Sequence, residues 1–297
     1  MTGIATLLRD FSFTECPRWH EGRIWFVDFY TNRVLSAAED GSELRTELEV
    51  PNQPGGLGWL PDGCLLVVSA QDRRILRREV DGEVVEHADL SRHIGGGNLN
   101  DMVVDGDGHA FVGNFGFDLA NGAEPASTNL LRVDPDGGIT EVADGLYFPN
   151  GSVVTDDNVL LVNETFGNRV TAFDIDPQGD LTNRRVWAQF GDVPVGSDLG
   201  TIITQVVVAP DGSCLDADGA LWIADAVNGK VIRVREGGEI LDEIQIDSGV
   251  FACMLGGADG RTLYLCSAPD FDPAARAAAR ESELRAVRVN VPHGGRP

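Results

Sequence analysis

The stretch from Leu57 to Val68, LGWLPDGCLLVV, places two short apolar segments on either side of a Pro-Asp-Gly turn. Both segments are shorter than a typical helix, and the second is rich in Leu and Val. An Asp-Gly pair between two such segments is typical of a tight turn in an antiparallel β-hairpin. This stretch therefore predicts two strands that fold back on each other.

The same pattern of strand, turn and strand occurs six times along the chain. The turns of the other five copies are His20–Gly22, Asp105–Gly108, Thr155–Asn158, Asp216–Gly219 and a Gly-rich turn that ends at Gly260. The copies follow one another at intervals of about 40 to 60 residues, the range of a propeller blade of four strands. We therefore predict an all-β fold, a six-bladed β-propeller, with residues 1–297 forming a single domain. A long β-sandwich is the alternative, but it does not explain six similar units.

The two ends of the chain are expected to close this ring. Ile4–Phe13 could pair with the last predicted strand, Glu283–Val289, and this pairing would leave no open sheet edge. Three other segments interrupt the repeat: the loops Phe117–Asn129 and Gln189–Gln205, and Pro273–Arg285, whose Ala and Arg residues predict a short helix. Long loops on a rigid scaffold often frame a binding site, although each could equally be a tolerated insertion.

The composition argues against two classes of partner. The 297 residues carry a net charge of −24, and so acidic a surface repels phosphate backbones and anionic lipids. No apolar run is long enough to span a bilayer. We therefore expect no nucleic-acid partner and no membrane partner, and we leave a monomer and a homodimer both open.

The N-terminus and the cysteines bear on the cellular compartment. Met1–Asp10 lacks the charged region and the apolar run of a secretory signal peptide. The five Cys residues include no C-x-x-C pair, and an odd number without regular spacing favours reduced, buried thiols. These observations predict a cytoplasmic protein.

Oxygen-bearing side chains occupy one equivalent position in four of the six copies. This position lies seven or eight residues before the end of the first hairpin turn, and its occupants are Glu15, Asn100, Asn150 and Asp211. In a propeller, the position is the start of the innermost strand, at one mouth of the central channel. The four side chains should therefore converge. Two of them are carboxylates, which cannot lie close together without a cation or a proton between them.

Carboxylate and amide oxygens suit a hard divalent cation, Ca²⁺ first, with Mg²⁺ and Mn²⁺ as further candidates. Zn²⁺ is possible, although it prefers His or Cys ligands. Three or four protein ligands would leave positions open for water or substrate, as in a catalytic metal site. The alternative is that these polar residues only cap strand ends and line a wet channel, and spacing alone leaves both interpretations open.

The sequence resembles the regucalcin/gluconolactonase (senescence marker protein) family of six-bladed propellers over almost its whole length. The motifs that carry the resemblance are Glu15 in TECPRW, Asn100-Asp101 in NLND, Pro149-Asn150-Gly151 and Pro210-Asp211-Gly212. The resemblance implies that Glu15, Asn150 and Asp211 ligate a divalent metal. It also implies that Asn100 contacts the substrate or water at the metal, and that Asp211 is the general base.

One position departs from the family pattern. The sugar lactonases of the family carry Arg two residues before the Asn of the Asn-Asp pair, and this chain has Asn98 there. The change removes a cationic group that could bind sugar hydroxyls or a carboxylate. Asn98 is therefore a candidate substrate-binding residue, and the sequence leaves the identity of the substrate open.

The function that this resemblance implies is that of a metal-dependent hydrolase that opens a small-molecule lactone, as a gluconolactonase does. The metal would polarise the ester carbonyl, and Asp211 would accept a proton from the attacking water. Two alternatives remain. The same site could hydrolyse organophosphates or aryl esters, or the propeller could bind a ligand or calcium without catalysis.

Overall fold

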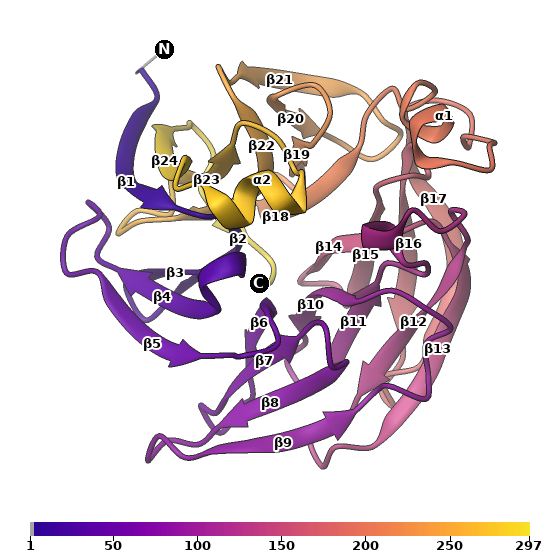
Figure 1. Cartoon of the computed structure of the whole chain (residues 1–297), viewed down its shortest axis with the longest axis horizontal. Coiled ribbons are helices and arrows are strands. Elements are labelled where there is room, and N and C mark those ends of the chain that lie inside the picture. Colours follow the sequence, from indigo (N-terminus) through magenta and orange to yellow (C-terminus); the bar gives the residue numbers. More distant parts are fainter. Residues whose placement is uncertain (1–2) are drawn as a thin grey trace.

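Six antiparallel sheets surround a central axis in the computed structural model, which describes residues 3–297 (Figure 1). The predicted six-bladed β-propeller is confirmed. Met1 and Thr2 lie outside the described residues, so the first two positions of the predicted domain 1–297 and of the segment Met1–Asp10 are not covered.

Each blade has four strands, ordered from the axis outward. The innermost strands, which contact one another around the axis, are β2 (Thr14–His20), β6 (Pro54–Trp59), β10 (Leu99–Val104), β14 (Pro149–Val154), β18 (Pro210–Asp216) and β22 (Gly249–Gly256). The second strands are β3 (Arg23–Asp28), β7 (Leu65–Ser69), β11 (Ala110–Asn114), β15 (Val159–Glu164), β19 (Leu221–Asp225) and β23 (Thr262–Ala268). The predicted turns join the first strand of each blade to the second.

The third and fourth strands complete each sheet. The third strands are β4 (Arg33–Ala37), β8 (Arg74–Arg78), β12 (Thr128–Val133), β16 (Arg169–Ile175), β20 (Lys230–Val234) and β24 (Ser282–Arg288). The outermost strands are β5 (Arg45–Glu49), β9 (Val84–Asp89), β13 (Ile139–Leu146), β17 (Leu181–Gln189), β21 (Ile240–Gln245) and β1 (Ala5–Phe11). A short fifth strand, β25 (His293–Gly294), pairs with the axis side of β18.

Both ends of the chain build the last blade. Strand β1 pairs antiparallel with β24, so the predicted closure of the ring by the N-terminal segment is confirmed. The helix predicted over Pro273–Arg285 is shorter than expected. It is α2 (Pro273–Ala278), and the chain from Ser282 onward pairs with β23 instead, because every second side chain there, such as Leu284, is buried.

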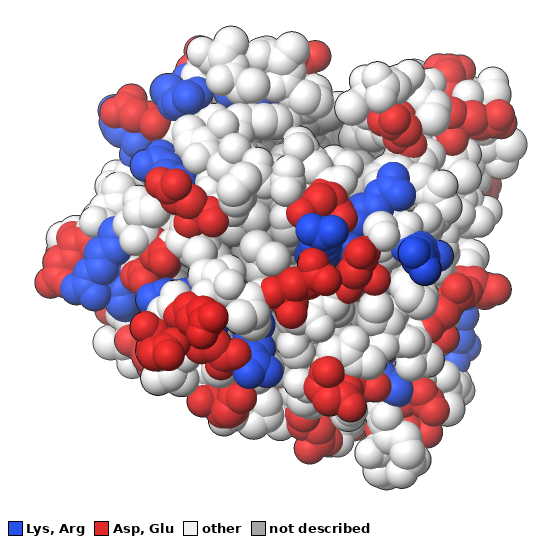
Figure 2. Space-filling model, turned by 60° about the horizontal axis from the view of Figure 1, so that its bottom comes forward, with Lys and Arg blue, Asp and Glu red and all other residues white. Residues whose placement is uncertain are grey.

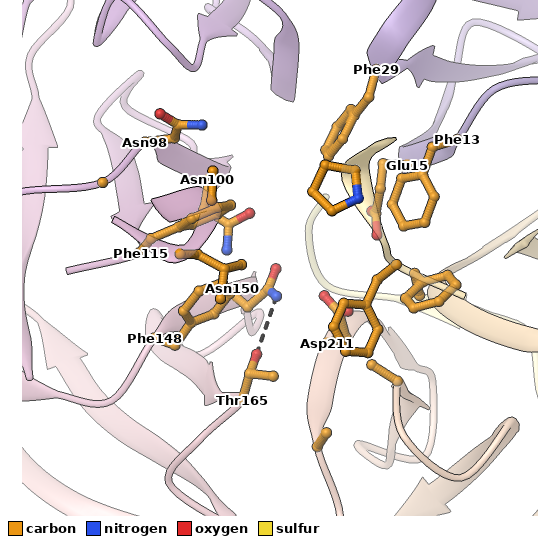
Figure 3. Close-up of a pocket in the computed structure, with 18 of the residues that line it drawn as sticks. Phe13, Glu15, Phe29, Asn98, Asn100, Phe115, Phe148, Asn150, Thr165 and Asp211 are labelled. Atoms are coloured by element: carbon orange, nitrogen blue, oxygen red, sulfur yellow. Dashed lines mark hydrogen bonds between the residues drawn. The ribbon is translucent and has the colours of Figure 1, made fainter. Parts of the chain in front are cut away.

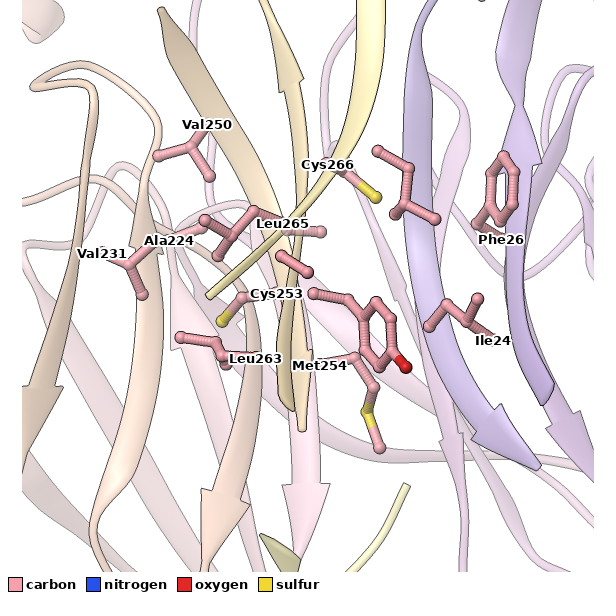
Figure 4. Packing of buried hydrophobic residues seen from close by; sticks show 14 of the residues in the cluster. Ile24, Phe26, Ala224, Val231, Val250, Cys253, Met254, Leu263, Leu265 and Cys266 are labelled. Atoms are coloured by element: carbon pink, nitrogen blue, oxygen red, sulfur yellow. The ribbon is translucent and has the colours of Figure 1, made fainter. Parts of the chain in front are cut away.

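The hydrophobic core lies between neighbouring blades. All five residues of β7 and of β19 are buried, because a second strand is covered on both faces by adjacent sheets. Figure 4 shows Cys253 and Leu265 of the last blade between Phe26 of the first blade and Val231 of the fifth. All five cysteines are free and buried, as predicted. The outermost strands are largely exposed and polar.

The short helices lie around one mouth of the channel. They are η1 (Phe29–Thr31), η2 (Leu119–Asn121), α1 (Leu199–Ile203) and α2, and each contributes at least one residue to the same cavity. The predicted loops Phe117–Asn129 and Gln189–Gln205 contain η2 and α1, so both loops frame this mouth. At the opposite mouth, Arg296 and Pro297 lie beside Trp19, Trp59 and the hairpin turn of blade three.

Acidic side chains are spread over the surface of the molecule. On the face in Figure 2, Lys and Arg side chains lie mostly beside Asp and Glu, and they form no continuous basic patch there. Ion pairs such as Arg74–Glu86, at 3.1 Å, join the two kinds of side chain. Within residues 3–297, no helix is both long and apolar enough to cross a membrane.

A buried carboxylate fastens the segment that closes the ring. Asp28 accepts hydrogen bonds from the backbone N–H groups of Ser12 and Phe13, both at 3.0 Å, and from the hydroxyls of Ser12 and Thr31. Its side chain is fully buried, so removal of the carboxylate leaves these donors without partners. We expect Asp28→Ala to lower the free energy of unfolding by about 2–4 kcal/mol in urea titrations followed by circular dichroism.

The control for this change is Asp62→Ala. Asp62 is exposed and accepts one turn hydrogen bond from Cys64 at 3.0 Å, so its loss should cost less than about 1 kcal/mol. Equal destabilisation by the two substitutions would contradict the role given to Asp28.

Candidate active site

The predicted residues meet because each begins an innermost strand. Glu15, Asn100, Asn150 and Asp211 are the second residues of β2, β10, β14 and β18. In each of these strands the register with the second strand shifts at once afterwards, for example between Pro149 and Ser152. A bulge at this point turns the strand locally and aims a side chain out of the ladder. The four side chains therefore lie at one mouth of the channel.

One cavity of about 230 Å³ contains every residue that the sequence singled out. Figure 3 shows the polar ends of Glu15, Asn150 and Asp211 facing one another on the floor of this cavity. Asn100 lies beside them, whereas Asn98 lies higher on the wall, farther from Asp211. The structure thus brings the three predicted metal ligands and Asn100 together and sets Asn98 apart.

The glycine that follows two of these residues permits their convergence. A Cβ atom on Gly151 would lie 2.4 Å from the backbone oxygen of Asp211, and one on Gly212 would lie 2.3 Å from Cβ of Ala252. Both distances are far below a van der Waals contact. Neighbouring innermost strands can therefore approach closely only where the chain has no side chain, which explains the Pro-Asn-Gly and Pro-Asp-Gly motifs.

The two carboxylates on the floor are deprived of water. Burial raises the pKa of Glu15 to about 8, and the nearby Asp101 carboxylate adds to the effect. Burial also raises the pKa of Asp211 well above its usual range, with the charges of Glu15 and Asp101 as further causes. The two groups interact, so a proton held between them belongs to the pair. Without a cation, this pair favours protonation.

The nearest cation is already engaged by another carboxylate. Arg18 is buried and donates to Oδ1 of Asp101 at 2.6 Å and to the backbone oxygens of Leu57 and Met102 at 3.0 Å and 2.8 Å. Its charge is therefore largely compensated by Asp101 and lowers the pKa of Glu15 less than burial raises it. Sequence reasoning missed this pair, although Arg18 and Asp101 both lie within the motifs that it quoted.

Hydrogen bonds orient the amides toward the floor. Nδ2 of Asn150 donates to Oγ1 of Thr165 at 3.1 Å, and that hydroxyl donates to the backbone oxygen of Pro210 at 2.8 Å. The amide group of Asn150 therefore uses its nitrogen within the protein, and its oxygen remains available. Nδ2 of Asn100 makes a longer contact, 3.4 Å, with the backbone oxygen of Pro149.

The donor set fits a hard divalent cation. Glu15 and Asp211 offer carboxylate oxygens and Asn150 offers an amide oxygen, and all three residues are buried. Residues 3–297 bring together no group of three or more His, Cys, Asp or Glu side chains suited to a metal ion. The candidate site has two carboxylates and amides instead, a composition that favours Ca²⁺ or Mg²⁺ over Zn²⁺.

Aromatic side chains form most of the wall above this floor, and sequence reasoning did not predict them. They are Phe13, Phe29, Tyr30, Phe115, Phe148, Phe166, Phe251 and Phe271. Some occupy equivalent positions: Phe13 and Phe148 directly precede innermost strands, and Phe29 and Phe115 directly follow second strands, whereas the others come from positions without such a match. Two signals were available: the Phe-rich character of the segments Phe11–Tyr30 and Phe111–Phe117, and the position of Phe13 and Phe148 two residues before Glu15 and Asn150.

The carboxylate pair makes a prediction about pH and stability. Between pH 4.5 and about 8, Glu15 holds a proton in the folded protein and loses it in the unfolded protein. The folded state then binds more protons, so the free energy of unfolding decreases as the pH rises through this range. We expect this decrease in urea titrations of chelator-treated protein, and we expect Ca²⁺ to reduce it by replacing the proton.

The matched variant is Glu15→Gln, whose amide does not titrate. Between the same pH values, the free energy of unfolding of this variant should decrease by on the order of 1–4 kcal/mol less than that of the parent protein. If the variant and the parent protein show the same dependence on pH, the desolvated pair is not the cause.

Comparison with known proteins places the chain among propellers of one family. The profile described as SMP-30/Gluconolactonase/LRE-like region matches residues 13–269. A 6-deoxy-6-sulfogluconolactonase of Pseudomonas putida is 26% identical over 95% of this chain and 93% of its own. A pentonolactonase of Haloferax volcanii is 27% identical over 95% of this chain and 92% of its own.

A solved structure shows the same fold. It is described as a calcium-binding protein, regucalcin, from Agrobacterium tumefaciens, and it aligns with a TM-score of 0.79 at 18% identity, covering 100% of this chain and 97% of its own. The profile match covers most of the chain, including every innermost strand and the whole floor of the cavity. The chain therefore belongs to the SMP-30/gluconolactonase/LRE-like family.

Proposed function

We propose that this protein is a metal-dependent hydrolase that opens a lactone. Two relatives that align over nearly the whole chain are lactonases by name, which supports lactone hydrolysis in general. The observation that carries the proposal is the pair of buried carboxylates, Glu15 and Asp211, on the floor of the cavity. Such a pair is costly to keep in a fold unless it performs chemistry or holds a cation.

Glu15, Asn150 and Asp211 would hold the divalent cation, with Ca²⁺ as the first candidate. When bound, the cation supplies Lewis acidity toward the ester carbonyl and compensates the charge of the carboxylates. The remaining work belongs to the side chains of the chain itself. Their burial keeps bulk water away from the floor, which strengthens every electrostatic interaction there.

Asp211 is the proposed general base. A desolvated carboxylate with a raised pKa accepts a proton more readily than an exposed one. Water attacks the carbonyl carbon of the lactone and gives its proton to Asp211. The bond between the carbonyl carbon and the ring oxygen then breaks, and the proton passes to the leaving alkoxide. The product is an open-chain hydroxy acid.

The amides position the reacting groups. Asn100 is half-buried beside the floor, and one of its polar atoms can contact the ester group of a substrate. Asn98 lies on the wall, where it can contact a more distant part of the substrate. Thr165 fixes the amide of Asn150, so this side chain needs little reorganisation during the reaction.

Hydrolysis of an aryl ester at the same floor is a second candidate function. The aromatic residues of the cavity wall favour it, because a flat aryl group packs well against aromatic rings. The chemistry of the floor would be the same for a lactone and for an open-chain ester. A panel that contains both kinds of substrate separates the two.

The test is turnover of a lactone and ester panel after chelation and after return of each divalent metal. We expect activity to disappear with the chelator and to return with metal, Ca²⁺ first. Asp211→Asn and Glu15→Gln should each lower kcat/KM by about 10²- to 10⁴-fold, because each removes a charged group from the floor.

Asp107→Asn serves as the control, because Asp107 is an exposed carboxylate in the hairpin turn of blade three. Its activity should equal that of the parent protein, with all variants checked by circular dichroism. Parent-like turnover by the Asp211 variant would refute the catalytic role. Metal binding without turnover of any substrate would support a binding protein in place of an enzyme.

A further inference from the structure

We infer that the cavity selects an uncharged substrate with a flat, apolar body, such as an aryl-fused lactone, in preference to a sugar lactone. The inference rests on the proposed function for the reaction, but it concerns the walls of the cavity and not its floor. Aromatic rings approach the floor from two opposite sides, and together they form a clamp over the reacting groups (Figure 3).

The first wall belongs to blades three and four. The rings of Phe115 and Phe148 are stacked with centroids 4.5 Å apart, and Phe166 lies against Phe148 at 4.9 Å. Phe117 packs behind both Phe148 and Phe166, at 6.1 Å and 6.2 Å. The wall is therefore supported from behind. Phe115 and Phe166 remain half-buried, so they have surface left to contact a ligand.

The second wall belongs to blades one and six. Phe13 packs against Phe251 with centroids 4.8 Å apart and against Phe29 at 5.5 Å. Tyr30 completes this wall, at 6.4 Å from Phe13. Burial raises the pKa of Tyr30 to about 12, so its ring stays neutral at any working pH. Phe271 lies at the outer edge and is 44% exposed.

The charged groups of the cavity are all acidic. Among the described residues that line it, the ionisable acids other than Tyr30 are Glu15, Asp118 and Asp211, and no Lys, Arg or His is present. Away from the floor, a carboxylate, sulfonate or phosphate on a substrate would meet the carboxylate of Asp118 and no cationic side chain. An anionic substrate is therefore disfavoured.

The faces of the two aromatic walls offer no strong hydrogen-bonding partner to sugar hydroxyls. Apart from Thr165 and Tyr30, the uncharged polar residues of the cavity are amides: Gln53, Gln71, Asn98, Asn100 and Asn150. Thr165 and Asn150 are already bonded to each other and lie at the floor. A polyhydroxylated ring between the two aromatic walls would turn several of its hydroxyls toward ring faces, where they lose hydrogen bonds to water, and this loss costs affinity.

A strained residue holds the first wall in place. Phe148 has a φ of 57°, a left-handed backbone conformation that is rare for a bulky residue. The next two residues are Pro149 and the floor residue Asn150, so this conformation directs an aromatic ring and an amide into the same cavity. Strain of this kind persists where the surrounding structure requires it, and it is concentrated at functional sites.

The test compares 3,4-dihydrocoumarin, an uncharged aryl-fused lactone, with D-glucono-1,5-lactone. We expect kcat/KM to favour the aryl lactone by about 100-fold or more, because it buries its ring between the two walls. Phe115→Ala and Phe13→Ala should each raise KM for the aryl lactone by about 10-fold and leave the sugar lactone nearly unaffected. Leu44→Ala, which shortens an exposed apolar residue far from the cavity, is the matched control.

A binding measurement separates this inference from the proposed reaction. 3,4-Dihydro-2-quinolinone, the lactam of the same shape, and gluconolactam are compared by saturation-transfer NMR. If the protein binds the aryl lactam and Phe115→Ala weakens this binding, the inference is supported even when no lactone is turned over. The absence of turnover would then contradict only the proposed function. Preference for the sugar lactone or its lactam, or no change in any measurement with the Phe variants, would overturn the inference.

Discussion

Two carboxylates that share one buried place on the axis impose the main constraint on this structure. Glu15 and Asp211 come from blades one and five, and burial raises the pKa of both. Each needs a proton or a cation nearby to remain there. The rigid ring keeps the two groups together despite this cost. Neither β2 nor β18 can move away without separating its sheet from the two neighbouring sheets that pack against it.

The ring depends on closure and on close approach. Strand β1 joins the last blade through β24, and Asp28 fastens the connection from β1 to β2 with three hydrogen bonds. At the axis, Gly151 and Gly212 let adjacent innermost strands come closer than any side chain would permit. These two features convert six similar hairpins into one site with a fixed floor.

Floor and walls have different origins, and this division separates reaction from selectivity. The floor residues occupy equivalent positions in repeated strands, and their carboxylate and amide groups suit one kind of reaction. The walls come from residues just outside these strands, such as Phe13 and Phe148, and from loops that differ between the blades. The loops can therefore change the substrate without disturbing the carboxylates, as is common when a site is carried on a rigid scaffold.

The repeat, the number of blades, the hairpin turns and the four residues at the mouth could all be predicted from the sequence, because each follows from a local pattern that recurs at a fixed offset. It did not reveal the outermost strands, such as Arg45–Glu49, since their exposed polar residues lack an apolar alternation. Nor did it reveal the Arg18–Asp101 pair or the aromatic clamp. Both depend on the folded ring, because their residues are far apart in the chain and meet only when the ring has closed.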